Sequence, residues 1–187
     1  MVEVHGEVVI DKTAELEIIE AAFEGLEYAV TQTEDMYARE DALVILNGSP
    51  DGLYTSLVVE CKDRQPPYDY AYFKSRGPMV ERGKLEALAG MPADRAIVVW
   101  RTADGYLIGA DADTALREGK VKRFERRAGN RQMDRGVEKV GIVIPFASCW
   151  VRPPLTSPNA FGRLTRKWYS WLTGYPLDKV EVRDGTG

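Results

Sequence analysis

The chain has 187 residues, 44% of them hydrophobic and 29% charged, a composition typical of a globular protein that can bury a core. No apolar stretch approaches the ~18 residues of a membrane span, and the N-terminus lacks the basic and apolar regions of a secretory signal. Two cysteines imply no disulfide framework, so we expect a cytoplasmic protein. The single histidine, His5, excludes a zinc site or a histidine-based nucleophile relay. The absence of a G-x-x-x-x-G-K-S/T loop argues against nucleotide hydrolysis.

The net charge of −4 is unevenly distributed along the chain. Residues 1–60 carry a net charge of −12, and the remainder carries +8. Eight basic residues fall between positions 117 and 135: Arg117, Lys120, Lys122, Arg123, Arg126, Arg127, Arg131 and Arg135. Such an asymmetry can mark a surface that binds a polyanion, although a solvated basic loop would look the same.

The first predicted element is a helix that begins after Asp11, a suitable N-cap residue, and extends to about Glu24. Its apolar residues follow the three-to-four-residue spacing of a buried stripe: Leu16, Ile19, Phe23 and Leu26. Residues 28–31 are rich in strand formers and predict a first strand.

Two apolar runs follow, and we expect them to form a hairpin. The first begins at Asp41, the second contains Glu60 and Lys62 near its end, and residues 47–52 between them are turn formers. Because successive strand side chains point to opposite faces, Glu60 and Lys62 share one face. The hairpin would bring Asp41 beside Glu60, so that two carboxylates and an ammonium group converge.

The next predicted elements complete an α/β pattern. Residues 64–79 contain two prolines that exclude a helix interior there, so we expect an irregular segment. Residues 80–89 predict a helix, residues 95–100 a strand buried on both faces, and residues 106–109 another strand. The order is αβββαβ, with a mixed sheet.

The last third of the chain is less regular. A basic segment leads to a predicted strand at 141–144, and Ser157 is a suitable N-cap for a final helix. One face of that helix is apolar: Phe161, Leu164, Trp168, Trp171 and Leu172. It could form a dimer interface, lie on a membrane surface, or cover the sheet as ordinary core. We therefore divide the chain into a core, 1–112, and an extension, 113–187, that could pack on the same domain.

Asp41 followed on the next strand by Glu60-x-Lys62 resembles the signature of the PD-(D/E)xK, or restriction-endonuclease-like, nuclease superfamily. The segment 58–64, with the helix and strand after it, is nearest in appearance to the archaeal Holliday-junction resolvases. The chain departs from the signature because Glu40, not proline, precedes Asp41, while Pro50-Asp51 falls in the turn. The resemblance implies a restriction-endonuclease-like αβββαβ core with a central mixed sheet.

The resemblance also implies roles for these residues. Asp41 and Glu60 would hold Mg²⁺ or Mn²⁺ together with the backbone carbonyl of Cys61, because oxygen ligands suit these ions. Lys62 would stabilise charge on the phosphate. Members of the superfamily often add a glutamate from the first helix, where Glu15, Glu17, Glu20 and Glu24 are available. Of these we favour Glu17 and Glu20 jointly as catalytic residues, against the alternative that all four solvate an exposed helix face.

Aromatic and basic residues predict the surface that would contact DNA. The aromatic side chains after Lys62 could stack on bases, or could only pack under their own loop. The candidate nucleic-acid-binding residues are Arg64, Tyr70, Lys74, Arg76, Lys120, Lys122, Arg123, Arg126, Arg127 and Arg131.

The sequence thus predicts a divalent-metal-dependent DNA endonuclease, restriction-like or junction-resolving, that acts as a homodimer and has no membrane partner. A domain of this size would cut one strand, so two copies would be needed for a duplex or a junction. The first alternative is a catalytically inactive nucleic-acid-binding or assembly module of the same fold. The second is a small-molecule or protein-binding α/β domain in which the Glu-x-Lys pattern is coincidental.

Overall fold

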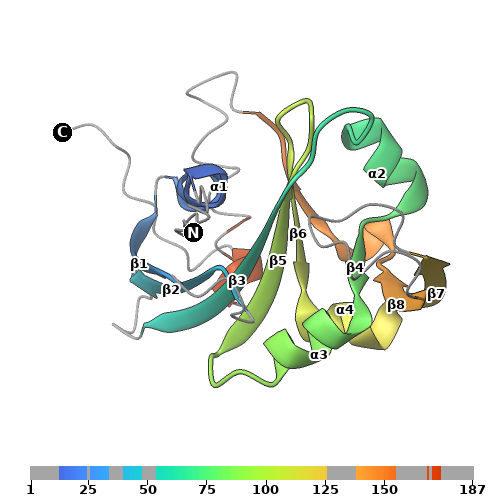
Figure 1. Ribbon diagram of the computed structural model, residues 1–187. Helices are drawn as coiled ribbons and strands as arrows, with labels where there is room; N and C mark the ends of the chain where they lie inside the picture. Colours follow the sequence, from blue (N-terminus) through green and yellow to red (C-terminus); the bar gives the residue numbers. More distant parts are fainter. Residues whose placement is uncertain are drawn as a thin grey trace, which may run out of the picture.

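The computed structural model describes residues 13–24, 26–33, 40–47, 54–125, 138–154, 168 and 170–173. These residues form an α/β fold with a central mixed sheet of six strands and a second sheet of three strands. Figure 1 shows α1 on one side of the large sheet, with α2, α3, α4 and the small sheet on the other. No helix in the described part of the chain is long and apolar enough to cross a membrane.

The described elements begin with the predicted order of a helix and three strands. The elements up to residue 111 are α1 (Thr13–Phe23), β1 (Glu27–Gln32), β2 (Ala42–Asn47), β3 (Thr55–Asp63), α2 (Tyr70–Arg76), β4 (Met79–Glu81), α3 (Arg82–Ala89), β5 (Arg95–Arg101) and β6 (Leu107–Asp111). They are followed by α4 (Ala112–Glu118), β7 (Lys120–Glu125), β8 (Glu138–Val143), a short 3₁₀ helix (Phe146–Ser148) and β9 (Trp150–Arg152). The predicted αβββαβ order is therefore present as α1, β1, β2, β3, α3 and β5, with α2 and β4 inserted before α3.

The large sheet has the strand order β1-β2-β3-β5-β6-β9. Among the described strands of this sheet, β3 and β5 alone pair in parallel, and α3 lies in the connection between them. A parallel pair needs such a crossover because the chain must return to the same end of the sheet. Both central strands are buried over most of their length, as predicted for residues 95–100.

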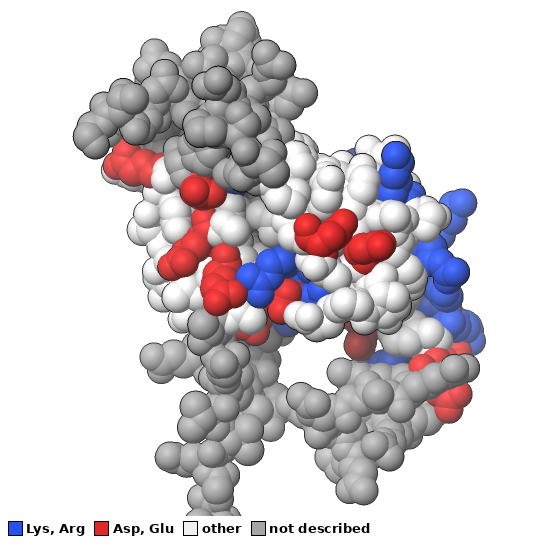
Figure 2. All heavy atoms as spheres, turned by 90° about the horizontal axis from the view of Figure 1, so that it is seen from above, with Lys and Arg blue, Asp and Glu red and all other residues white. Residues whose placement is uncertain are grey.

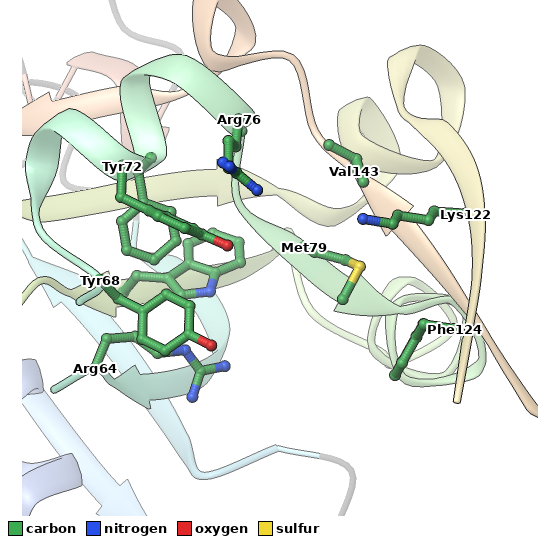
Figure 3. Close-up of a pocket in the computed structure, with 11 residues that line it drawn as sticks. Arg64, Tyr68, Tyr72, Arg76, Met79, Lys122, Phe124 and Val143 are labelled. Carbon is green, nitrogen blue, oxygen red and sulfur yellow. The ribbon is translucent and has the colours of Figure 1, made fainter. Parts of the chain in front are cut away.

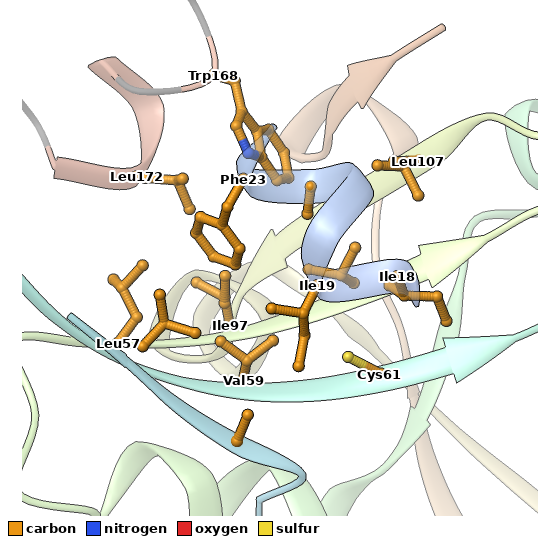
Figure 4. Packing of buried hydrophobic residues seen from close by; sticks show 14 of the residues in the cluster. Ile18, Ile19, Phe23, Leu57, Val59, Cys61, Ile97, Leu107, Trp168 and Leu172 are labelled. Carbon is orange, nitrogen blue, oxygen red and sulfur yellow. The ribbon is translucent and has the colours of Figure 1, made fainter. Parts of the chain in front are cut away.

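One core lies between α1 and the large sheet. Ile18, Ile19 and Phe23 of α1 are fully buried and pack with Leu57 and Val59 of β3 (Figure 4). The same cluster contains Trp168 and Leu172, with Trp171 partly buried against it. Of the predicted apolar stripe of the first helix, Ile19 and Phe23 are buried in this core and Leu26 packs against it, whereas Leu16 is not part of it. The interpretation of the last helix as ordinary core is confirmed for its described residues.

A second core fills the opposite face of the large sheet. Trp100 of β5 is fully buried there, with Leu85 and Leu88 of α3 and Ile142 of β8. Alternate residues of β3 therefore belong to different cores: Val58 packs on this side and Val59 on the α1 side. This alternation places Glu60 and Lys62 on the α3 side.

The prediction of an irregular segment at 64–79 was wrong for residues 70–76, which form α2. The two prolines, Pro66 and Pro67, precede the helix instead of lying inside it, and the peptide bond between them is cis. Asp69 is the N-cap: its side chain accepts a hydrogen bond from the backbone N–H of Tyr72 at 2.8 Å. Such a cap satisfies an N–H group that the first turn cannot pair internally.

The region after residue 112 contributes to both sheets. β9 pairs with β6 at the edge of the large sheet, and β7 and β8 pair in the small sheet with β4. The strand predicted at 141–144 is thus part of β8. The basic segment begins in the last turn of α4 and includes β7, and neither element was predicted. Arg126, Arg127 and Arg131, together with Ser157, lie outside the described residues.

Candidate functional site

The hairpin of β2 and β3 places Asp41 beside Glu60, as predicted. Ala42 of β2 is opposite Val59 of β3 in the antiparallel register. Asp41, the residue before Ala42, is therefore beside Glu60, the residue after Val59. The backbone N–H of Asp41 donates to the carbonyl of Val59 at 2.9 Å. Its Oδ2 accepts a hydrogen bond from the N–H of Cys61 at 2.6 Å. The turn residues 48–53 that connect the strands lie outside the described part of the chain.

Glu60 is a buried carboxylate held by two lysines. Its exposed fraction is 3%, and its Oε1 accepts from the ammonium group of Lys62 on the same strand. Its Oε2 forms an ion pair with Lys84 Nζ of α3 at 2.8 Å. A buried charge must be paired, because its transfer from water is otherwise strongly unfavourable. The two ammonium groups provide this compensation for Glu60.

Asp41 lies in an environment that opposes its ionisation. Its pKa is raised from 3.8 to about 6, mainly by burial and in addition by the nearby negative charges of Glu60 and Glu15. The hydrogen bond from the Cys61 N–H and the charge of Lys62 act in the opposite direction. The carboxylates are therefore close enough to repel one another, and a cation placed between them would relieve that repulsion.

The first helix contributes Glu15 to this region, not the residues that we favoured. Glu15 acts electrostatically on both Asp41 and Cys61. Glu17 is exposed and pairs at 2.8 Å with Arg101 of β5, which lies opposite Asp63 at the end of β3. Glu20 is exposed and acts on Tyr28 of β1. Glu15 is thus an additional candidate from α1, and the choice of Glu17 and Glu20 as catalytic residues stays a prediction. Helical spacing alone did not show which turn of α1 faces the start of β2.

Cys61 contributes its backbone and not its thiol. The thiol is buried in the core under α1, and burial raises its pKa well above the ordinary value, so it does not serve as a nucleophile. The N–H of Cys61 points towards Asp41. In an extended strand the C=O of a residue points to the same side as its N–H, so this carbonyl also faces the Asp41 edge of β3.

The donor chemistry of the site fits a hard divalent cation. Asp41, Glu60 and Glu15 offer carboxylate oxygens and Cys61 a carbonyl oxygen, the ligands that Mg²⁺ and Mn²⁺ prefer. Among the described residues, however, no group of three or more His, Cys, Asp or Glu side chains is already arranged to enclose a metal ion. Glu60 is held by its lysines instead, so a cation would have to displace at least one of them.

The predicted nucleic-acid-binding residues fall into three groups. Arg64, Arg76 and Lys122 line one cavity on the α3 side of the large sheet. Tyr70 is stacked on Tyr106 with ring centroids 4.4 Å apart, so it is a packing residue. The remaining three in the described part of the chain are surface residues of α2 and β7: Lys74, which lies 5.9 Å from the Tyr70 ring, Lys120, and Arg123, which pairs with Glu138 at 3.0 Å.

The charge asymmetry of the sequence is also an asymmetry in space. Figure 2 shows acidic side chains gathered on the side of the molecule where α1 and β1 lie, and a row of basic side chains along the opposite edge. That edge carries α2 and β7. The described acidic residues of α1 and β1 and the described basic residues of α2 and β7 therefore lie on different sides of the molecule, and a polyanion would meet the α2 and β7 edge.

Sequence reasoning missed Lys84 and did not select Glu15. Lys84 lies two residues after the start of α3, where the crossover from β4 brings it over β3. The only sequence signal was its place near the start of the predicted helix after Glu60. Comparison of the chain with protein-family models, with curated proteins and with solved structures finds no match.

Proposed function

We propose that this protein is a divalent-metal-dependent nuclease of restriction-endonuclease-like fold that hydrolyses phosphodiester bonds in DNA. The observation that carries the proposal is the meeting of Asp41, Glu60 and Lys62 where β2 begins beside β3. The strand order β1-β2-β3-β5, with α1 before it and α3 in the crossover, supports the same assignment.

Asp41 and Glu60 would hold the cation, with Glu15 and the Cys61 carbonyl close enough to contribute. A bound Mg²⁺ or Mn²⁺ lowers the pKa of its water and neutralises charge on the phosphate. Hydrolysis replaces one phosphorus–oxygen ester bond with a bond to the oxygen of water, and the leaving oxygen takes up a proton. The role of the chain is to hold charges of the right sign around that phosphate.

Lys62 and Lys84 supply positive charge to the substrate. Both are bound to Glu60 in the structure, so an ammonium group released from Glu60 would need a new anionic partner. A DNA phosphate placed beside β3 is such a partner. Because α3 carries Lys84 and β3 carries Lys62, the phosphate would be contacted from two elements, which fixes its position more firmly than one lysine could.

The ion pairs of Glu60 also favour a second candidate function. A carboxylate that is paired with two lysines is stable without a metal ion. This arrangement suits a nucleic-acid-binding module of the same fold that has lost catalysis. Such a module would bind DNA with a steep dependence on salt and with no metal requirement.

Cleavage assays separate the two functions. Labelled duplex, single-stranded and four-way-junction DNA are incubated with Mg²⁺, with Mn²⁺ or with EDTA, using the wild-type chain and Lys62→Ala. We expect metal-dependent cutting that Lys62→Ala reduces by at least about 100-fold, the effect of removing one preorganised electrostatic group. Cutting of the duplex or the junction on both strands should require a homodimer, which light scattering with bound DNA measures. Intact DNA in every lane, with a folded protein, would rule out the nuclease and favour the nucleic-acid-binding module.

A further inference from the structure

A cavity of about 450 Å³ lies between α2, the loop after β3 and the small sheet. This volume is within the range of about 300–1,000 Å³ that is usual for small-molecule sites. In Figure 3, Arg64 after β3, Arg76 on α2 and Lys122 on β7 reach towards it from its different walls. The described lining residues include these three cations and no carboxylate, although the chain as a whole is acidic.

Aromatic rings form the wall of the cavity on the α2 side. Tyr68 and Tyr72 meet edge to face with ring centroids 4.9 Å apart, and Tyr68 remains 40% exposed. The guanidinium group of Arg76 lies 5.3 Å from the centroid of the Tyr72 ring. Exposed aromatic faces beside cations are the combination that binds nucleotides, because the rings stack on a base and the cations contact its phosphate.

Trp100 at the back of the cavity has an unused hydrogen-bond donor. Its indole is fully buried, and among the described residues its Nε1 has no hydrogen-bond partner. A buried N–H without a partner costs about 1–3 kcal/mol. A nucleobase in the cavity would bring oxygen and ring-nitrogen acceptors to the wall to which Trp100 belongs.

The cavity adjoins the candidate catalytic site. Lys62 of β3 is directly opposite Trp100 of β5 in the parallel register. Neighbouring strands lie about 5 Å apart, so the wall of the cavity begins one strand away from Lys62. A nucleic acid strand with one phosphate at Lys62 would present an adjacent nucleotide to the cavity.

We propose that this cavity holds one unstacked nucleotide of a nucleic acid, with its base against Tyr68 and Tyr72 and its phosphate near Arg64, Arg76 or Lys122. The proposal rests on the proposed function and specifies its substrate. Extrusion of a base from a duplex costs a few kcal/mol, and least for a base that is already unpaired. The preferred substrate is therefore DNA with a bulge, a mismatch or a single-stranded segment beside the cleaved bond.

Binding measured in EDTA tests the cavity without any cleavage. Fluorescence anisotropy compares a fully paired duplex with the same duplex carrying one bulged nucleotide. We expect the bulged DNA to bind at least about tenfold more tightly, since its base is already unpaired. Tyr72→Leu should reduce this preference to less than about twofold, whereas Tyr54→Leu, an exposed tyrosine outside the cavity, should retain it. Thermal unfolding confirms that both variants are folded.

A second pair of variants tests the phosphate contact. Arg76→Ala should weaken binding of the bulged DNA, while Arg82→Ala, an exposed arginine of α3 outside the cavity, should weaken it less. Equal affinity for the two DNAs, or a preference unaffected by Tyr72→Leu, would overturn the proposal. If thymidine monophosphate displaces the bulged DNA at concentrations as low as those of the DNA itself, the ligand of the cavity is a free nucleotide. That result would overturn the proposal that the cavity binds a nucleic acid.

The outcomes for the cavity and for the nuclease are independent. Metal-dependent cleavage without any preference for the bulge would overturn the cavity proposal and leave the nuclease. A preference for the bulge that depends on Tyr72, in a protein that cuts no DNA with Mg²⁺ or Mn²⁺, would support the cavity and overturn the nuclease.

Discussion

Two acidic clusters lie near the C-terminal end of β3, one around Glu60 and one around Asp63, and their electrostatic environments differ. At the start of β2, burial and neighbouring carboxylates raise the pKa of Asp41 to about 6. At the end of β3, hydrogen bonding to Arg101 at 2.9 Å lowers the pKa of Asp63. Arg101 also pairs with Glu17, and hydrogen bonding to Asp63 is the largest cause of the rise in its pKa.

The comparison separates a structural cluster from a candidate functional one. In the Arg101 cluster the guanidinium group compensates Asp63, whose pKa is lowered, and also pairs with Glu17. The cluster of Asp41, Glu60 and Glu15 brings carboxylates together at an electrostatic cost that folding alone does not require. Crowded titratable groups of this kind are more frequent at functional sites than elsewhere.

The largest expected difference is in catalysis. Asp41→Asn should reduce metal-dependent cleavage by at least about 100-fold, because the amide keeps the acceptor for the Cys61 N–H but loses the charge that holds a cation. Asp63→Asn is the matched control, since it removes a carboxylate of the same strand region from the compensated cluster. Its cleavage rate should stay within about twofold of wild type. Similar losses in both variants would mean that net charge, and not the Asp41 site, controls activity.

The second test compares the two lysines on Glu60. Lys84→Ala should reduce cleavage by about tenfold, less than Lys62→Ala, because Lys62 remains to contact the phosphate. Either variant leaves the buried Glu60 with one partner, so each should also lower the melting temperature. Lys84→Arg, which keeps the positive charge, should recover part of the cleavage rate. A rate for Lys84→Ala equal to wild type, in folded protein, would limit Lys84 to a structural role.

Much of this site could be predicted because it depends on strand geometry. The alternation of side chains placed Glu60 and Lys62 on one face, and the turn formers after Asn47 indicated a hairpin with Asp41 beside Glu60. Lys84 and the choice among the glutamates of α1 could not be predicted. Their positions depend on how α3 and α1 rotate against the sheet, which is fixed by packing of residues such as Phe23 and Leu85 that are distant in sequence.

The same reasoning explains why the segment after β3 was predicted incorrectly. Pro66 and Pro67 indicated a break, which is correct locally, but a helix begins immediately after it at Tyr70. The signal for that helix was Asp69, an N-cap residue directly before Tyr70, whose side chain accepts a hydrogen bond from the backbone N–H of Tyr72. The cavity beside Trp100 depends on α2 and on the small sheet, and neither could be placed from the sequence.

The third test is the effect of pH on stability. The pKa of Asp41 in the folded chain, about 6, is above its ordinary value of 3.8, so the folded state favours the protonated form. The free energy of unfolding should therefore decrease as pH rises from about 4 to about 6, by an amount on the order of 1–2 kcal/mol after allowance for solvent screening. Urea unfolding at pH 4, 5, 6 and 7 should show this slope in wild type and a smaller one in Asp41→Asn. Equal slopes would mean that Asp41 is not held in a repulsive environment.

The smallest effect distinguishes two glutamates of α1 that lie two residues apart. Glu15→Gln should lower the affinity for Mn²⁺ by about two- to fivefold, measured by calorimetry, because one of the charges that act on Asp41 is removed. Glu17→Gln should leave that affinity unchanged, since Glu17 is engaged with Arg101. Equal effects of the two variants would indicate that the helix acts only through its total charge. A larger effect of Glu17→Gln would restore the residue that helical spacing favoured and would contradict the position of α1 over the sheet.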